Sequence, residues 1–266
     1  MFNDPFDVPQ ELQLNFNEAE LNRAFGERLI AIFEGSGSDY APSTSRLRQL
    51  KSVMDDLQAR PEIRQSVIDA WRRSAGATTP GQIELMERLK KKWRDEIAPT
   101  FRILCLSELN DITSMWYLYA GAYRGVVLEF ETVDRLDSAF LSARAVTYQD
   151  ELPPIANKEI WAQYMSERGP LTLEDFLTGF VYRKTMSWAY EREWRIVDFA
   201  LDDEPGLFSD TGFFSRELTG VYLGAKCSQE DESGIVALLT HGFEHVAVYK
   251  ASIGGIESKF TFQRIR

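Results

Sequence analysis

Two glutamates separated by one arginine lie in an aromatic stretch, WAYEREWRI, at residues 188–196. In an extended chain, residues two positions apart point the same way, so Glu191, Glu193 and Arg195 are expected to share one face. Two carboxylates on one face can be held in different protonation states by their surroundings, which suits acid–base chemistry or the stabilisation of a positive charge. The alternative is a salt-bridged strand face on which Arg195 or Lys184 compensates the two acids.

The histidines and cysteines offer weaker candidates. His241 and His245 are four residues apart, as two metal ligands on a helix can be, but a glycine follows His241 and no third ligand lies nearby in the sequence. We therefore expect polar residues at a helix end and no metal. Cys105 and Cys227 each lie in an apolar, strand-like stretch, which predicts buried thiols in a reducing compartment rather than nucleophiles. The sequence also contains neither a P-loop nor a G-x-S-x-G motif.

The composition is that of a folded protein without a membrane span. Of the 266 residues, 44% are hydrophobic and 12% are aromatic, which is enough for a buried core. No apolar run reaches the roughly 20 residues that cross a bilayer, and the acidic start MFNDPFD is unlike a secretory signal. Together with the free thiols, this predicts a cytoplasmic protein that does not bind membranes.

The net charge of −11 is unevenly distributed along the chain. Residues 46–102 carry 13 Lys and Arg against 8 Asp and Glu, while the remainder is strongly acidic. An acidic surface repels nucleic acid, so the middle segment alone offers a basic surface. A solvated helical face of mixed sign is the simpler interpretation of that segment.

The N-terminal part is predicted to be helical, and residues 46–98 are expected to form a helical insertion. Apolar residues recur at three- and four-residue spacing, as on one face of a helix, on both sides of a Gly-, Ser- and Pro-rich break at 34–45. Pro61 separates two of these helices. The apolar stripes are Leu21, Phe25, Leu29 and Phe33, then Leu47, Leu50, Met54 and Leu57, then Ile63, Val67 and Trp71, and last Met86, Leu89, Trp93 and Ile97.

After residue 100, patterns of strand and helix follow one another. Strands are expected at 101–108, 125–131, 143–150, 193–200, 218–225, 245–252 and 258–266, and helices at 111–121, 158–169, 172–188 and 229–243. The helix at 172–188 has the clearest pattern, with Thr172 as its N-cap. This order predicts the α+β class, as one domain over 1–266: a mixed, mostly antiparallel sheet with segregated helices and the insertion at 46–98.

Four segments together resemble a bacterial family known as domain of unknown function 2971, which occurs in many bacteria and phages. They are FNDPFD at 2–7, LCLSELNDITSMWYLYAGAYRGVVLEFE at 104–131, Lys184 with WAYEREWR at 188–195, and LTGVYLGAKCSQEDESGIVALL at 218–239. They follow one another in order over most of the chain outside 46–98. The family name itself implies no function.

The order of a strand that ends in serine, a helix, a strand and a later Glu-x-Glu is also similar to the ADP-ribosyltransferase fold. That resemblance implies NAD as the cofactor, Ser107 as support for the nicotinamide pocket, Glu193 as the catalytic glutamate and Glu191 as the residue that prepares the acceptor. The chemistry is coherent, because breaking the nicotinamide–ribose bond creates an oxocarbenium-like cation that a carboxylate stabilises.

The same resemblance implies further site residues. Besides Ser107, those expected to contact the cofactor are Trp116, Tyr119, Trp188, Asn3 and Asp4, although the three aromatic residues also fit a hydrophobic core. Further polar side chains of the site are Lys184, Tyr190 and Arg195. Relatives usually carry a strand with a basic residue ahead of the Asn-Asp-Pro motif, whereas this chain starts at the motif. The chain start is therefore either shortened, or the protein does not use the dinucleotide.

The sequence thus favours an ADP-ribosyltransferase-like enzyme, a toxin or phage-defence effector that modifies a protein or a nucleic acid. The alternative is a non-catalytic binding or immunity module of a bacterial defence system, which uses the aromatic cleft and residues 46–98 as its interface. A nuclease is a third hypothesis. It needs a divalent metal on Asp4, Asp7, Glu191 and Glu193, and the net charge argues against it.

Overall fold

The computed structural model describes residues 12, 14–35, 40–74, 87–167, 172–201, 204, 206, 208–254 and 260–266. The chain divides into two compact units, each made of two stretches of sequence. Unit 1 is Met1–Thr100 with Thr147–Thr185, and unit 2 is Phe101–Val146 with Met186–Arg266. Asn3 and Asp4, which the family resemblance implies near a cofactor, lie outside the described residues.

Unit 1 begins with three helices, α1 (Glu18–Glu34), α2 (Ser45–Asp56) and α3 (Pro61–Ser74). Asn17 starts α1 with a capping box, in which its side chain accepts from the Glu20 N–H at 3.0 Å and the Glu20 carboxylate accepts from the Asn17 N–H at 2.9 Å. Thr44 caps α2 through the Leu47 N–H. The described part of residues 46–98 is helical, as its apolar periodicity predicts.

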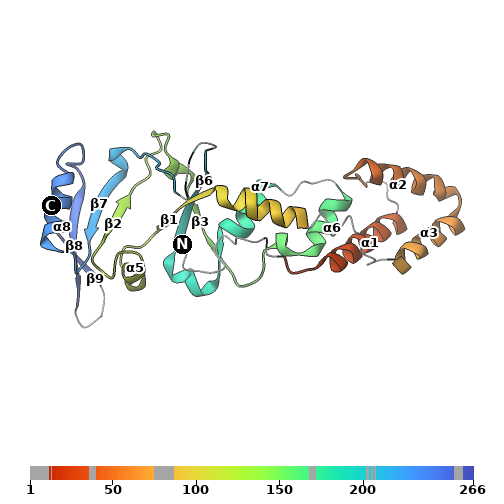
Figure 1. The fold of residues 1–266 in the computed structure, drawn as a ribbon, viewed down its shortest axis with the longest axis horizontal. Coiled ribbons are helices and arrows are strands. Elements are labelled where there is room, and N and C mark those ends of the chain that lie inside the picture. The colour runs from red at the N-terminus through yellow and green to blue at the C-terminus, as the bar shows by residue number, and fades with distance from the viewer. Residues whose placement is uncertain are drawn as a thin grey trace. The chain divides into compact units, whose positions relative to one another are not determined.

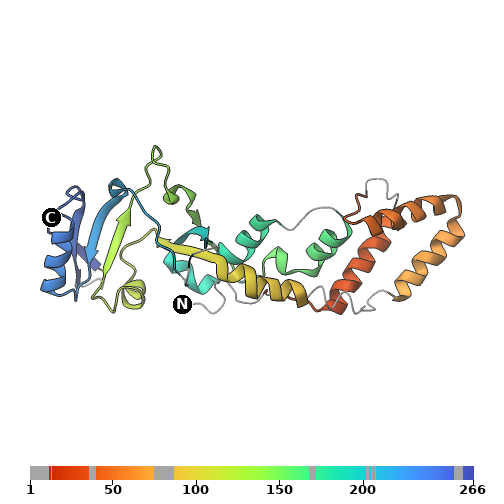
Figure 2. The ribbon, with the colours of Figure 1, turned by 45° about the horizontal axis from the view of Figure 1, so that its top comes forward.

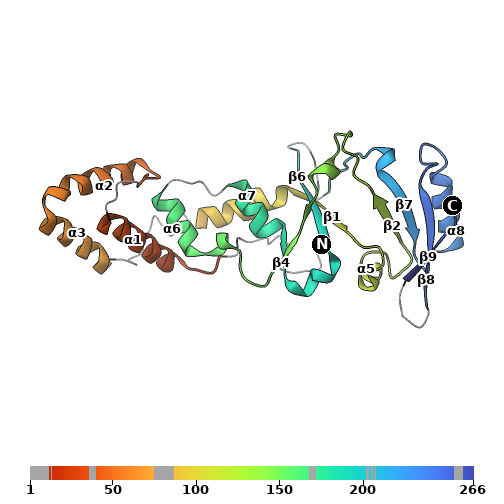
Figure 3. The same cartoon turned by 180° about the vertical axis from the view of Figure 1, so that it is seen from behind.

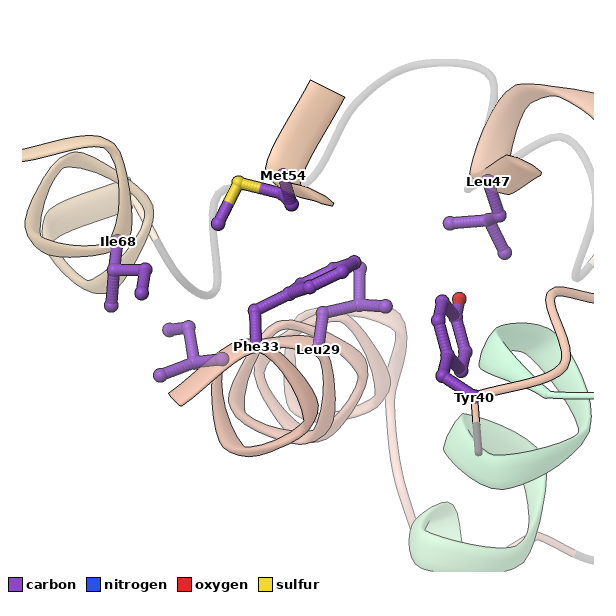
Figure 4. Close-up of a cluster of buried hydrophobic side chains, with 7 residues drawn as sticks. Leu29, Phe33, Tyr40, Leu47, Met54 and Ile68 are labelled. Carbon is purple, nitrogen blue, oxygen red and sulfur yellow. The ribbon is translucent and has the colours of Figure 1, made fainter. Parts of the chain in front are cut away.

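A hydrophobic cluster joins α1, α2 and α3 (Figure 4). Its buried members are Leu29, Ile30, Phe33, Tyr40, Leu47, Met54 and Ile68. The expected stripe on α3 is wrong in part, because Ile63 is 49% exposed while Ile68 is buried. Successive residues are about 100° apart around a helix, so Val67 and Trp71 fit a stripe with either isoleucine, and packing against α1 and α2 decides between them.

Helix α6 (Lys158–Ser166) packs against α1 in unit 1 (Figures 1 and 3). Residues 87–92 are helical and continue into a π-helical turn at Trp93–Ile97. A cavity of about 50 Å³ lies among Leu12, Leu89, Lys92, Trp93, Ile97, Trp161 and Phe176. Pockets for drug-sized ligands measure roughly 300–1,000 Å³, so this cavity is a packing gap rather than a ligand site.

The helix that begins after Thr172 is much shorter than the range of 172–188 that the sequence predicts. Thr172 is its N-cap, as predicted, and forms a capping box with Asp175, but α7 is Leu173–Phe176 and one π-helical turn then ends at Val181. Strand β5 (Arg183–Lys184) follows and pairs in parallel with β4 (Thr147–Tyr148). Gly179 weakens the helix by about 1 kcal/mol relative to alanine, and pairing with β4 favours the extended backbone beyond it.

Among its described residues, unit 2 contains two sheets. The first has the order β1-β6-β3 and is antiparallel throughout, with β1 at Phe101–Ser107, β6 at Glu193–Phe199 and β3 at Arg144–Ala145. The second has the order β2-β7-β8-β9, with β2 at Val126–Phe130, β7 at Leu218–Leu223, β8 at Ala247–Ile253 and β9 at Phe260–Arg264. Strands β7 and β8 are parallel and the other pairs antiparallel. The α+β class with mostly antiparallel pairing is confirmed.

Two helices cover opposite faces of the second sheet (Figure 1). Strand β7 sends Val221 and Leu223 into the cluster under α8 (Gln229–Leu238). It sends Tyr222 into the cluster with Trp116 of α5 (Thr113–Leu118). Figure 2 shows the same elements turned about the horizontal axis. Alternation along β7 therefore separates the core of unit 2 into two layers.

The prediction that both thiols are buried is wrong for the one in strand β1. Cys227 is buried, and burial raises the pKa of its thiol, but Cys105 is exposed. Its neighbour Leu104, on the opposite side of the strand, is exposed as well. An apolar run predicts a strand but not which of its faces is covered. Within the described residues, no helix has the length and apolar character needed to cross a membrane.

Candidate functional site

The central feature of the site is a buried ion pair within β6. The Arg195 guanidinium contacts both oxygens of Glu193, with Nε to Oε1 at 2.8 Å and Nη2 to Oε2 at 3.2 Å. The side chains are 0% and 4% exposed, respectively. The two residues share one face of the strand, as their spacing predicts. Such bidentate pairing fixes the carboxylate in one orientation.

The backbone around Glu193 is held on both sides by neighbouring strands. On one side Ser107 pairs with Glu193 and Cys105 with Arg195, in the antiparallel register of β1 and β6. On the other side the Val146 N–H donates to the Glu193 carbonyl at 2.9 Å. The ion pair therefore lies on the middle strand of its sheet.

Glu191 does not share the strand face with Glu193, so this part of the prediction is wrong. It ends a 3-10 helical segment at Met186–Glu191, and Arg192 follows in the left-handed region with φ of 44°. A left-handed residue turns the chain, so the two-residue spacing of a strand does not apply across it. The Glu191 side chain is buried, and its Oε1 accepts from the Tyr119 hydroxyl at 3.1 Å.

Ser107 connects the end of β1 to this turn. Its hydroxyl donates to the Glu191 carbonyl at 2.7 Å and accepts from the Leu109 N–H at 3.2 Å. The Glu108 N–H donates to the Arg192 carbonyl at 3.2 Å. Ser107, Glu191 and Glu193 thus meet at one end of the β1–β6 pair. In this arrangement the serine hydroxyl contacts backbone groups and supports the turn.

The aromatic candidates have different environments. Trp116 is 2% exposed, its indole N–H donates to the Asn110 carbonyl at 2.6 Å, and its ring packs on Phe260, so it belongs to the core of unit 2. Tyr119 is 53% exposed. Trp188 is half-buried beside the exposed Tyr190, with ring centroids 6.1 Å apart. Tyr119, Trp188 and Tyr190 therefore keep accessible surface, and Trp116 does not.

The remaining candidates are Lys184 and the histidines. Lys184 belongs to unit 1, where it is buried in β5 and pairs with Tyr148. His245 points its Nε2 at the carbonyls of Ser215 and Leu218, at 3.0 and 3.1 Å, which makes it a structural donor. In the part of the chain that the structure describes, no three His, Cys, Asp or Glu side chains gather in a way that suits a metal ion.

The sequence gives no signal for several buried polar groups of unit 2. Glu217 is fully buried, and its carboxylate accepts from the Ser138 hydroxyl and from the Phe214 N–H at 2.9 Å. The Tyr222 hydroxyl donates to Glu129, and burial together with that carboxylate raises the pKa of Tyr222 to about 12. Single acids next to apolar strands give no signal that distinguishes a buried carboxylate from a solvated one.

Comparison with known proteins gives one match. A family model described as "Protein of unknown function (DUF2971)" matches residues 115–196. No curated protein and no solved structure matches the chain, and the resemblance to the ADP-ribosyltransferase fold stays a prediction. The matched segment contains Tyr119, Glu191, Glu193 and Arg195, and it supports the resemblance of this chain to the family of unknown function.

Proposed function

We propose that the end of the β1–β6 pair is the active site of an enzyme that cleaves the nicotinamide–ribose bond of NAD and transfers ADP-ribose to a macromolecule. The observation that carries the proposal is the meeting of three residues. Ser107 pairs with Glu193 across the strands and bonds to the carbonyl of Glu191. A serine-ended strand beside two glutamates is the arrangement that the resemblance to the ADP-ribosyltransferase fold implies.

In the proposed reaction, the bond between nicotinamide and ribose C1′ breaks and both electrons leave with nicotinamide. Positive charge then develops on C1′ and the ring oxygen, and the Glu193 carboxylate stabilises it. In the structure, Arg195 engages both oxygens of that carboxylate. Because the two side chains are 0% and 4% exposed, NAD reaches the Glu193 carboxylate only when this pair opens. Guanidinium groups also bind phosphates bidentately, so the pyrophosphate then offers Arg195 another partner and releases Glu193 for the cation.

Glu191 is proposed to act on the acceptor. The acceptor nucleophile forms the new bond to C1′ and gives its proton to the Glu191 carboxylate. The Tyr119 hydroxyl bonds to this carboxylate and would hold it in place. Tyr119 is more than half exposed, whereas Glu191 is 2% exposed. An acceptor as large as a protein or a nucleic acid can therefore approach the Tyr119 side chain from solvent, and the tyrosine must move aside for it to reach Glu191.

The test is release of nicotinamide from NAD in the presence of cell extract, followed by chromatography. Glu193→Gln keeps the shape of the side chain, removes its charge and should lower the rate by about 100-fold or more, as the loss of one electrostatic contact to a transition state does. Glu217→Gln is the matched control, since this carboxylate is equally buried in the same unit. Wild-type protein that releases no nicotinamide with any extract would refute the proposal.

A second candidate is a non-catalytic binding module, and the closed Glu193–Arg195 pair favours it. Both groups are buried and engaged with each other, as in a purely structural ion pair. Residues 46–98 would then supply the interface. Reversing the charges of the exposed Arg48 and Arg73 should abolish capture of a partner from extract, while Glu193→Gln should leave capture intact. The opposite pattern would reject this candidate.

A further inference from the structure

The turn between α5 and β2 is held in an unusual backbone conformation. Gly121, Ala122 and Tyr123 are all left-handed, with φ of 56°, 53° and 73°. Residues other than glycine are uncommon in this region, and they persist where the surrounding structure fixes them. Such positions concentrate at functional sites, so the surface that this turn presents is a candidate for binding.

Hydrogen bonds fix the turn against the end of β7. The Lys226 N–H donates to the Tyr123 carbonyl and the Gly224 N–H to the Gly125 carbonyl, both at 2.9 Å. A Cβ atom at Gly224 would lie 2.1 Å from the Tyr123 oxygen, so only glycine permits this approach. The turn is therefore a rigid support rather than a loose loop.

The turn displays two tyrosine rings, and the cation of Lys226 lies over one of them. Tyr117 is 59% exposed, and its ring lies 5.9 Å from that of Tyr123 at 53°. The Tyr123 ring also packs against Phe260, with the two ring centroids 6.1 Å apart. The Lys226 ammonium lies 5.3 Å from the centre of the Tyr123 ring, and both Lys226 and Arg124 are exposed.

We propose that this surface, which we call the tyrosine platform (Tyr117, Tyr123, Arg124 and Lys226), binds a nucleotide unit. The base stacks on the open ring of Tyr117, and the phosphate lies between Lys226 and Arg124. Exposed aromatic rings flanked by cations bind nucleotides in this way, because every base has a π-face and the phosphate requires positive charge. The Lys226 ammonium over the Tyr123 ring, with the exposed Arg124 next to Tyr123 in the chain, favours an anionic ligand over a cationic one.

The platform does not depend on the transferase proposal. Tyr119, which bonds to Glu191, follows Tyr117 by two positions and so points to a different side of the α5 end. A nucleotide on the platform is thus bound apart from the Glu191 carboxylate. Its source is either a free nucleotide or one unit of a single strand, and these two sources share the same chemistry.

The experiment measures binding of a fluorescent single-stranded oligoadenylate to the full chain at low salt, with unlabelled AMP as competitor. Tyr117→Ala and Lys226→Ala should each weaken binding about tenfold, while Tyr117→Phe, which keeps the ring, should bind like wild type. Tyr164→Ala, at an exposed tyrosine of unit 1, is the control and should change affinity less than about twofold.

The outcomes separate the two sources. If AMP displaces the oligoadenylate, a free nucleotide is sufficient for binding. If the oligoadenylate binds and AMP does not displace it, the ligand is a single strand. Failure of wild-type protein to bind either ligand, or equal binding by Tyr117→Ala and Lys226→Ala variants that remain folded by circular dichroism, overturns the proposal. Oligoadenylate binding is measured without NAD, and nicotinamide release is measured without oligoadenylate, so a failure of the platform and a failure of the transferase proposal are distinguishable.

Discussion

Removing one partner of the Glu193–Arg195 pair should strongly destabilise unit 2. Both side chains are almost completely buried, and the guanidinium satisfies both carboxylate oxygens. Arg195→Met would remove the guanidinium that engages both oxygens of the buried Glu193 carboxylate, and the loss of a buried partner costs about 3–5 kcal/mol. A typical protein is stable by about 5–15 kcal/mol, so this single change removes a large part of the total.

A double-mutant cycle measures the coupling energy between the two residues. Glu193→Leu should be as costly as Arg195→Met, because it removes the other member of the buried pair. The combined Glu193→Leu and Arg195→Met variant replaces the pair with apolar groups of similar size and should lose about 1 kcal/mol or less. The two single losses would then exceed the loss in the double variant by about 5 kcal/mol or more, and this difference is the coupling energy between the two sites.

Amide hydrogen exchange followed by mass spectrometry is the suitable assay, because the chain has two units and need not unfold in one transition. Peptides from β1 and β6 should lose protection in each single variant and regain it in the double variant. Glu108→Gln is the control, since its ion pair with Arg192 is exposed at 3.8 Å and worth about 1 kcal/mol or less. Single variants that cost under about 1 kcal/mol, or losses that simply add, would refute a mutually dependent buried pair.

Three further predictions concern thiols, a phenol and a helix cap. A maleimide should label Cys105 in the native protein and Cys227 only after unfolding, since Cys227 is buried and its thiol pKa is raised; two fast labels in the native state would contradict this. Stability should be complete below about pH 10 and fall towards pH 12, because the folded state binds the Tyr222 proton more tightly than the unfolded state does. Tyr222→Phe should flatten this fall in urea titrations. Asn17→Ala should lower stability by about 1 kcal/mol through loss of the capping box, and an unchanged urea midpoint would show that the cap contributes nothing.

The sequence locates the strands of unit 2 well, because each is a short apolar run between polar turns. The run at 193–200 becomes β6 at Glu193–Phe199, and the run at 218–225 becomes β7 at Leu218–Leu223. The long helix expected at 172–188 fails for a tertiary reason. Residues 183–184 pair with β4, and a helical period in the sequence contains no information about that partner.

The site shows the same division between local and tertiary information. The pairing of Glu193 with Arg195 follows from two-residue spacing in a strand and is visible in the sequence. The departure of Glu191 from the strand is not visible in the sequence, because it depends on the left-handed Arg192. Nothing in the residue types of that stretch requires this conformation. It is stabilised by bonds from residues more than 80 positions earlier, at the end of β1.

The geometry of WAYEREWRI is therefore a property of the strand pair rather than of the stretch itself. Register places Ser107 opposite Glu193, and this position lets the serine hydroxyl reach the Glu191 carbonyl while the next amide reaches the Arg192 carbonyl. Those two bonds oppose the strain of a non-glycine left-handed residue, which is of order 1–2 kcal/mol. A slip of β1 by one residue would turn Ser107 to the other face and break the bond that supports this turn. The turn between Glu191 and Glu193 thus depends on one strand register.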